Sequence, residues 1–233
     1  LKLTDNIIVN SLDFQKEFKK VFNVKSICIY NPLNKKEVIL KSKKNLEFPF
    51  FKKKNYQLNI INVARFTDQK DHMTLLKAVN LIKNKINFKL LIVGRGVNKA
   101  KMINFINENR LKNKVKIINF QNNPYKYIGK SNLFVLTSKF EGLPNVLLES
   151  IALKKFIISS NCPTGPREIL MNGKGGELFD IGNYKELSKK IISFYFNEEK
   201  YQKKINISFK SLHRFDYHLN LQKYLNVIKK LII

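Results

Sequence analysis

Two glutamates in the stretch SKFEGLPNVLLES, Glu141 and Glu149, stand eight positions apart around the predicted start of a helix. A carboxylate does not bind phosphate, but it accepts hydrogen bonds from neutral hydroxyl groups. The segment between the two, Gly-Leu-Pro-Asn at 142–145, offers backbone N–H groups at a helix N-terminus, where the helix dipole favours an anion. The stretch therefore predicts carboxylates that accept hydrogen bonds from hydroxyl groups beside N–H groups that donate hydrogen bonds to phosphate.

Cations and glycines at two other strand ends extend this set. Arg65 and Lys70 follow one predicted strand, and Gly94 and Gly96 follow the next. These glycines, like Gly142, permit a close approach of backbone. Groups that bind phosphate, together with carboxylates that bind sugar hydroxyls, predict a nucleotide sugar as the ligand.

Apolar strands alternate with helices from Leu58 onward. The predicted strands are 58–65, 88–94, 115–120, 133–138 and 156–160. The predicted helices are 72–84, 98–110, 124–131, 144–154 with Pro144 at its first position, 165–172, 183–197 and 215–233. Continuously apolar strands indicate a Rossmann-like α/β fold, a parallel sheet with helices on both faces. Ligands of such sheets bind outside the carboxyl ends of the strands.

The first 56 residues are less regular. A strand at 7–9, a helix at 12–22 and a strand at 26–30 are predicted. Residues 33–56 are polar and lysine-rich, and they are predicted to form a linker with an edge strand at 37–40.

Composition limits the function classes. The chain has 233 residues, of which 44% are hydrophobic, so a disordered chain is not expected. No apolar run reaches the roughly 18 residues that span a bilayer, so a membrane-spanning chain is not expected either. The formal charge of +27 fits a solvated lysine-rich surface, an anionic membrane or ligand, or nucleic acid. No motif that reads nucleic acid is present, and no nucleic acid partner is expected. Cys28 and Cys162 are expected to be reduced thiols. The start lacks a signal peptide and an initiator Met, so we expect the chain to begin inside a longer product.

Several motifs, in the same order, resemble the C-terminal part of a family 4 glycosyltransferase with the GT-B architecture. They are E-x7-E at Glu141 and Glu149, ARFTDQK at 64–70, LLIVGRG at 90–96, FVLTSKFEGLPNVLLES at 134–150 and NCPTGPREIL at 161–170. The last one is most similar to the branch that transfers N-acetylgalactosamine or similar hexoses from UDP donors. Within it, Arg167 and Glu168 are expected to pair with each other.

The resemblance implies roles for these residues. Arg65 and Lys70 would neutralise the diphosphate of the donor, Glu141 would bind hydroxyls of the transferred sugar, and Glu149 would bind the ribose. The backbone at Gly142, Leu143, Pro144 and Asn145 would hold phosphate and sugar, beside Gly94 and Gly96. Asn119, Phe120 and Gln121 would contact the base. No metal or other cofactor is implied, and the anomeric configuration would be retained.

The resemblance also implies domain boundaries. Residues 1–31 would be a remnant of an N-terminal acceptor domain, 32–56 a linker, 57–212 the nucleotide-sugar domain and 213–233 a crossover helix. The apolar face of that helix, with Leu219, Tyr224 and Ile228, is expected to be exposed or to dock elsewhere.

Two functions of different class remain open, with a third more distant. The first is an enzyme that moves a hexose or N-acetylhexosamine from a UDP-sugar to a glycan or lipid-linked acceptor. The second is a module that binds a nucleotide sugar and needs a partner acceptor domain. The third is a nucleic-acid-binding protein driven by charge. A cytoplasmic location, with peripheral contact to anionic membrane at its inner face, is a hypothesis that charge alone motivates.

Overall fold

The structure is a computed structural model, and it describes residues 7–51 and 57–232. Residues 1–6 of the predicted remnant, 52–56 of the predicted linker and residue 233 of the predicted crossover helix lie outside the described residues.

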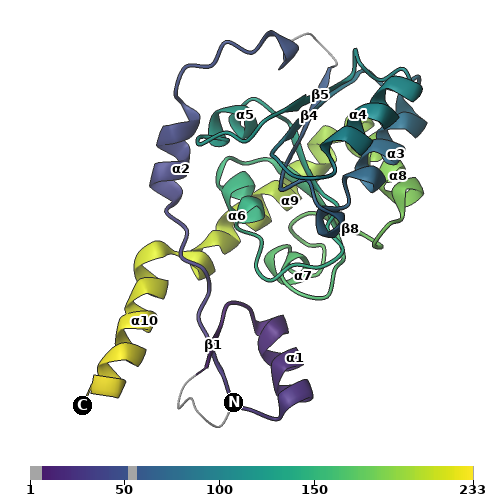
Figure 1. Cartoon of the computed structure of the whole chain (residues 1–233). Coiled ribbons are helices and arrows are strands. Elements are labelled where there is room, and N and C mark those ends of the chain that lie inside the picture. Colours follow the sequence, from purple (N-terminus) through teal and green to yellow (C-terminus); the bar gives the residue numbers. More distant parts are fainter. Residues whose placement is uncertain (1–6, 52–56, 233) are drawn as a thin grey trace.

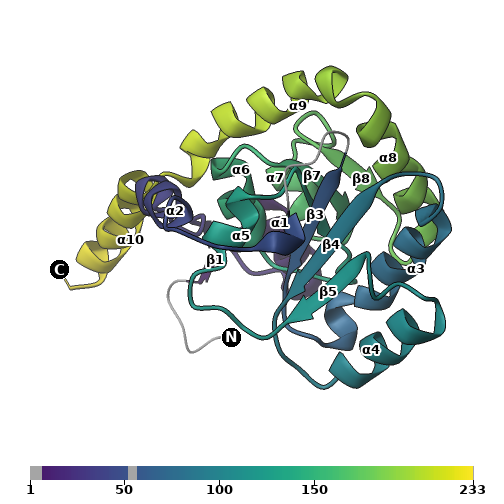
Figure 2. The ribbon, with the colours of Figure 1, turned by 90° about the horizontal axis from the view of Figure 1, so that it is seen from above.

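The centre of the molecule is a parallel six-stranded sheet with the order β5-β4-β3-β6-β7-β8 (Figure 2). Its strands are β3 (Leu58–Val63), β4 (Phe88–Val93), β5 (Val115–Ile118), β6 (Leu133–Leu136), β7 (Phe156–Ser160) and β8 (Glu177–Phe179). This confirms the predicted Rossmann-like sheet, although β8 was not predicted. Strand order reverses between β3 and β6, and such a switch point opens a crevice at the carboxyl ends of the strands.

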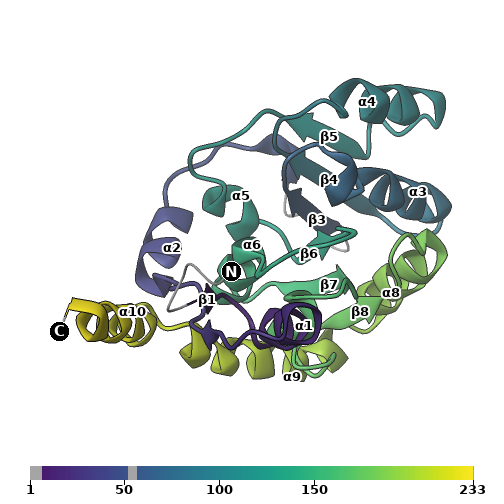
Figure 3. The ribbon, with the colours of Figure 1, turned by 60° about the horizontal axis from the view of Figure 1, so that its bottom comes forward.

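Successive residues of each strand enter two different cores. Ile60 belongs to one buried cluster, and its neighbour Ile61 belongs to the other; neither is exposed to solvent. This alternation explains why the strands are apolar throughout, since both faces of the sheet are covered. Figure 3 shows α3, α4 and α8 on one side of the sheet, with α2, α5 and α6 on the other. The helices are α2 (Lys35–Ser42), α3 (His72–Ile82), α4 (Lys99–Glu108), α5 (Tyr125–Gly129), α6 (Asn145–Ala152), α7 (Pro166–Ile169), α8 (Tyr184–Phe196) and α9 (Glu198–Ser211).

Strands β3 and β6 separate toward the crevice. Their pairing within the described residues consists of Ile60 with Leu133 and Ile61 with Phe134. One residue further, the buried side-chain amide of Asn62 donates to the carbonyl of Val135 at 2.8 Å. A side chain thus replaces a ladder bond where the strands diverge.

The predicted linker is partly helical, and the edge strand predicted at 37–40 is wrong. Helix α2 occupies this stretch, with the side chain of Asn34 capping the amide of Glu37 at 3.1 Å. Lys41 and Glu37 form an i,i+4 ion pair at 2.5 Å. Since Val38 is the buried residue of this helix, the helix lacks the apolar periodicity that a sequence reading relies on.

Two further differences concern helices. Pro144 is the N-cap of α6, not its first helical residue, and its backbone is extended. Helix α9 was not predicted at all. Its residues are highly charged, and the buried ones, such as Tyr201 and Ile205, are sparse.

Residues 8–28 form a separate β-α-β unit. Strand β1 (Ile8–Val9) pairs in parallel with β2 (Ile27–Cys28), and α1 (Leu12–Phe22) connects them. The predicted strand-helix-strand pattern is confirmed, with both strands shorter than predicted. Helix α1 buries none of its residues, and Val21 is 65% exposed. The assignment of this unit to an N-terminal acceptor domain stays a prediction.

The last helix, α10 (Tyr217–Ile232), extends away from the sheet (Figure 1). Leu219, Leu225 and Ile228 on it are exposed, whereas Tyr224 is half-buried. The exposed apolar surface therefore agrees with the sequence prediction. Across the described residues, no helix combines the length and apolarity that crossing a bilayer requires.

Candidate functional site

Hydrogen bonds hold the loops after β3 and β6 together across the crevice. The amide of Lys139 donates to the carbonyl of Gln69 at 2.8 Å, and the Gln69 side chain donates to the carbonyl of Phe140 at 2.9 Å. The hydroxyl of Thr137 donates to the carbonyl of Lys70 at 2.9 Å. The predicted strand-end residues are thus brought to one place at the switch point.

Lys70 and Glu141 form an ion pair between the loops that follow β3 and β6. The ammonium Nζ lies 2.6 Å from Oε1 of Glu141, and the hydroxyl of Ser138 donates to the same oxygen at 2.6 Å. The Lys70 side chain is 15% exposed and that of Glu141 is 7% exposed. The cation predicted to bind diphosphate is therefore paired with the carboxylate predicted to bind the sugar.

Gly94 and Gly96 bring the loop that carries Arg65 against the end of β4. A Cβ on Gly94 would lie 1.9 Å from the carbonyl oxygen of Ala64. Gly96 has φ +151°, and a Cβ there would lie 2.5 Å from the carbonyl oxygen of Phe66. The close approach predicted at these glycines is made by protein backbone, because both glycines lie against the loop after β3 that carries the exposed Arg65.

We expect Gly94→Ala to destabilise the fold by about 2 to 3 kcal/mol, because the new methyl overlaps a backbone carbonyl that cannot rotate away. Chemical denaturation measures this free energy of unfolding. Gly182→Ala is the matched control. Gly182 has φ +75°, and a Cβ added there would meet no atom within 4 Å, so this substitution should cost only about 1 kcal/mol of backbone strain. Equal losses for the two variants would contradict the packing role of Gly94.

The loop at 142–145 has a buried middle and exposed ends. Leu143 and Pro144 are buried, whereas Gly142 and Asn145 are exposed. Gly165 supports the loop from below: it has φ +86°, and a Cβ there would lie 2.1 Å from the carbonyl oxygen of Gly142. This support was not predicted, although the glycine stands within the NCPTGPREIL motif.

Two neighbours fix the same loop. The hydroxyl of Thr164 donates to the carbonyl of Glu141. The side-chain amide of Asn31 donates to Oδ1 of Asn145 at 2.8 Å. The predicted phosphate-binding loop is therefore held from the β7–α7 connection and from the N-terminal segment.

Glu149 on α6 is half-buried and is bonded to Tyr125, a residue that sequence reasoning missed. The Tyr125 hydroxyl donates to Oε1 of Glu149 at 3.0 Å. Burial raises the pKa of the Glu149 carboxyl, and the hydrogen bond from Tyr125 partly opposes that rise. Burial, followed by the Glu149 charge, raises the pKa of the Tyr125 phenol. No signal in the sequence joined the two residues, since they lie on separate helices.

The predicted base-contact residues lie at the end of β5. The ring of Phe120 is 55% exposed, and the guanidinium of Arg95 lies 5.3 Å from its centroid. The Lys99 ammonium donates to Oδ1 of Asn119 at 2.8 Å, and the Tyr127 hydroxyl donates to Oε1 of Gln121 at 3.2 Å. An exposed ring beside cations offers a stacking surface for a planar base.

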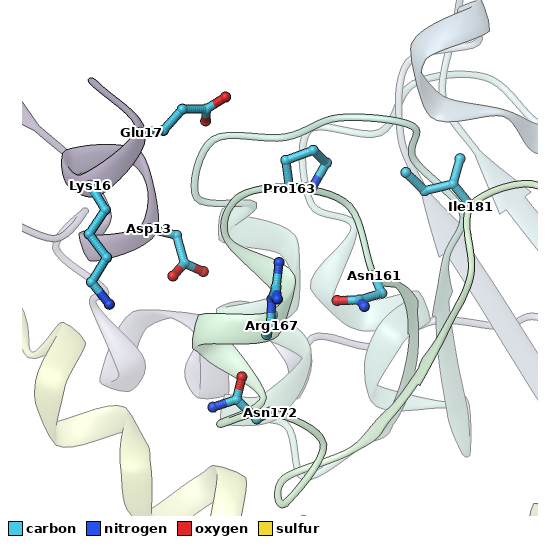
Figure 4. Close-up of a pocket in the computed structure, with 8 residues that line it drawn as sticks. All are labelled: Asp13, Lys16, Glu17, Asn161, Pro163, Arg167, Asn172 and Ile181. Atoms are coloured by element: carbon cyan, nitrogen blue, oxygen red, sulfur yellow. The ribbon is translucent and has the colours of Figure 1, made fainter. Parts of the chain in front are cut away.

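The expected pairing of Arg167 with Glu168 is wrong. The Glu168 carboxylate accepts instead from the amides of Leu12 and Asp13 and from the hydroxyl of Tyr30. Arg167 lines a pocket of about 650 Å³ between α1 and the loops after β7 and β8. Figure 4 shows the Asp13 carboxylate pointing from α1 toward Arg167.

Comparison with known families shows which family the chain belongs to. The family described as Glycosyl transferases group 1 matches residues 43–211. The chain belongs to the group 1 glycosyl transferases. Residues 43–211 of this chain, which match the family, contain the whole six-stranded sheet and every predicted site residue.

Relatives in the group 1 glycosyl transferases match the central part of the chain. An uncharacterized glycosyltransferase of Methanocaldococcus jannaschii is 42% identical over 111 residues, which are 47% of this chain and 27% of the relative. N-acetylgalactosamine-N,N'-diacetylbacillosaminyl-diphospho-undecaprenol 4-alpha-N-acetylgalactosaminyltransferase of Campylobacter jejuni is 36% identical over 124 residues, 53% of this chain and 33% of the relative. The matches span a third or less of the length of these relatives.

Solved structures of glycosyltransferases share the fold. HepE from Anabaena, in complex with UDP and glucose, superimposes with a TM-score of 0.83 and 18% identity over 97% of this chain and 63% of that one. The similarity confirms the predicted GT-B type of fold.

Proposed function

We propose that this chain is the donor-binding part of a retaining glycosyltransferase, which moves a hexose or N-acetylhexosamine from a UDP-sugar to a glycan or lipid-linked acceptor. The observation that carries the proposal is the ion pair of Lys70 with Glu141, which joins the loops after β3 and β6. The exposed Arg65 lies in the first of these loops, and the half-buried Glu149 lies on the helix that follows the second. Cations for a diphosphate and carboxylates for two sugars lie at one edge of the sheet.

Each group has a separate task in this proposal. Arg65 and Lys70 stabilise the negative charge that develops on the departing diphosphate. Binding of the diphosphate draws Lys70 away from Glu141, and the freed carboxylate accepts hydrogen bonds from hydroxyls of the transferred sugar. Glu149 accepts from the ribose hydroxyls, and the base stacks on Phe120. No cluster of three His, Cys, Asp or Glu side chains able to hold a metal occurs among the described residues, and independence from metal is part of the proposal.

The relatives support the choice of donor and acceptor. The name of the Campylobacter jejuni relative specifies transfer of N-acetylgalactosamine to a sugar linked through diphosphate to undecaprenol. The Anabaena structure contains UDP and glucose. For this chain we propose a UDP-linked donor, a lipid-linked or glycan acceptor, and a cytoplasmic enzyme whose charge of +27 draws it to anionic membrane. Equal partition to neutral and anionic liposomes would remove the membrane contact from the proposal.

A nucleotide-sugar-binding module that needs a partner acceptor domain is the second candidate. Two observations favour it: α1 buries none of its residues, and α10 exposes Leu219, Leu225 and Ile228. Apolar surface of this kind commonly marks a contact with another domain. In this case the chain binds UDP but transfers no sugar until the acceptor domain is added.

Calorimetric titration with UDP, UDP-hexoses and GDP tests the proposal. We expect UDP and one UDP-sugar to bind and GDP to bind more weakly. Binding without transfer to any acceptor would favour the second candidate. The absence of binding to all three nucleotides would reject both.

Tyr125→Phe should make UDP binding more sensitive to acid. Without the hydroxyl, the pKa of Glu149 rises further, because burial still disfavours its charged form and the stabilising hydrogen bond is gone. Ribose hydroxyls donate to the ionised carboxylate, so binding is lost as the pH falls through this pKa. The acid limb of UDP affinity should therefore move to higher pH in the variant. An unchanged pH profile, measured by titration calorimetry, would show that Tyr125 does not tune Glu149.

A further inference from the structure

Glu168 on α7 joins the donor-binding sheet to the N-terminal β-α-β unit. Its carboxylate accepts from the amide of Leu12 at 3.0 Å, from that of Asp13 at 3.1 Å and from the hydroxyl of Tyr30 at 2.5 Å. The side chain of Ser11 caps the next amide of α1 at 3.1 Å. The first amides of α1 are therefore bonded partly by its own cap and partly by a residue more than 150 positions away.

The charge of Glu168 suits this place. A carboxylate at a helix N-terminus is favoured by the helix dipole, and amide–carboxylate bonds are stronger than neutral ones. Hydrogen bonds across the other end of α7 hold Glu168 in position: the Arg214 guanidinium donates to the carbonyls of Glu168 and Ile169, each at 3.2 Å. The backbone that carries the Glu168 carboxylate is thus held by a residue outside the N-terminal unit.

The same short helix is packed against the loop at 142–145. Gly165 immediately precedes α7 and lies against Gly142 and Pro144, with no space for a Cβ between them. A movement of α7 therefore displaces the loop that carries Glu141 and leads into α6. The N-terminal segment reaches this loop a second time through the bond from Asn31 to Asn145.

We propose that Glu168 is a positioning residue that locks the N-terminal unit onto the donor site, so that docking of α1 and order in the 141–145 loop are coupled. The coupling rests on the proposed function only where UDP is used to detect the coupling. The contact between Glu168 and α1 does not depend on the proposed function. By linkage, a ligand that orders the loop must also favour the docked state of α1.

Amide hydrogen exchange of the full chain, with and without UDP, tests the lock. In the wild type we expect UDP to slow exchange in the 137–149 segment and also in α1. In Glu168→Gln we expect α1 to exchange about 10- to 100-fold faster without ligand, the loss expected for a hydrogen bond to a charged group. UDP should still protect 137–149 in this variant, but its effect on α1 should be lost.

Two further variants guard against an unspecific effect. Glu108→Gln removes the same charge from an exposed position on α4 and should leave α1 unchanged. If Glu168→Gln unfolds as a whole, Tyr30→Phe removes one donor and should give a smaller, few-fold rise confined to the N-terminal unit. Unchanged α1 exchange in both variants overturns the lock. If the wild type binds no UDP, the proposed function fails, while ligand-free exchange of α1 still decides on Glu168.

Discussion

Lys70→Met should destabilise the protein by about 3 to 5 kcal/mol and abolish UDP binding. The substitution leaves the Glu141 carboxylate, which is 7% exposed, without the cation that lies 2.6 Å away. Removing one partner of a buried ion pair costs more than the pair itself contributes, since a charge stays buried and unpaired. The diphosphate also loses one of its two proposed cations. Chemical denaturation measures the first effect, and titration calorimetry measures the second.

The double variant Lys70→Met/Glu141→Gln separates the two effects. With the buried charge removed as well, most of the stability should return, because no uncompensated ion remains. UDP binding should not return. Recovery of UDP binding in the double variant would show that Lys70 affects binding only by neutralising Glu141. The proposed contact of Lys70 with the diphosphate would then be wrong.

Glu149→Gln should weaken UDP binding by about 10- to 100-fold, the range for losing hydrogen bonds to a charged group. The fold should not lose stability. Burial already disfavours the charged form of Glu149, and a glutamine keeps an oxygen that accepts from Tyr125. The expected result is therefore a binding defect in a protein that unfolds at the same denaturant concentration.

Inorganic pyrophosphate is the matched control ligand for this variant. It carries the diphosphate that we propose Arg65 and Lys70 bind, but no ribose. Glu149→Gln should therefore leave its affinity unchanged, while Lys70→Met should remove it. Equal weakening of pyrophosphate and UDP by Glu149→Gln would indicate a general disturbance of the crevice, and ribose recognition by Glu149 would be wrong.

Much of the fold was predictable because the strands are buried on both faces. Five of the six strands of the sheet, from LNIINV at 58–63 onward, are apolar runs with turn residues behind them. Elements without such a pattern were missed or misassigned. Helix α2 is stabilised by a cap and an ion pair around the single buried Val38, and β8 is three residues long with Phe179 as its buried residue.

The candidate site divides in a similar way. Lys70, Glu141 and the glycines follow strands, so topology alone brings them to one edge. The residues that hydrogen-bond to the site or to its supporting helices lie on other elements of the chain. Tyr125 meets Glu149 across two helices, and Glu168 meets α1 across most of the chain. Such pairs depend on how helices pack, and no spacing along a single sequence encodes that.

The short pairing between β3 and β6 has a consequence for the order of folding. Each half of the sheet closes from strands that are neighbours along the chain, whereas the Asn62–Val135 bond joins residues 73 positions apart. When only β3, β4 and β5 have left the ribosome, the nascent chain contains Arg65 and Lys70 but neither Glu141 nor Glu149. That nascent half displays uncompensated positive charge, and it acquires its own counter-ion only when β6 arrives. Completion of the sheet therefore supplies the counter-ion of Lys70 in the same step that joins the two halves of the sheet.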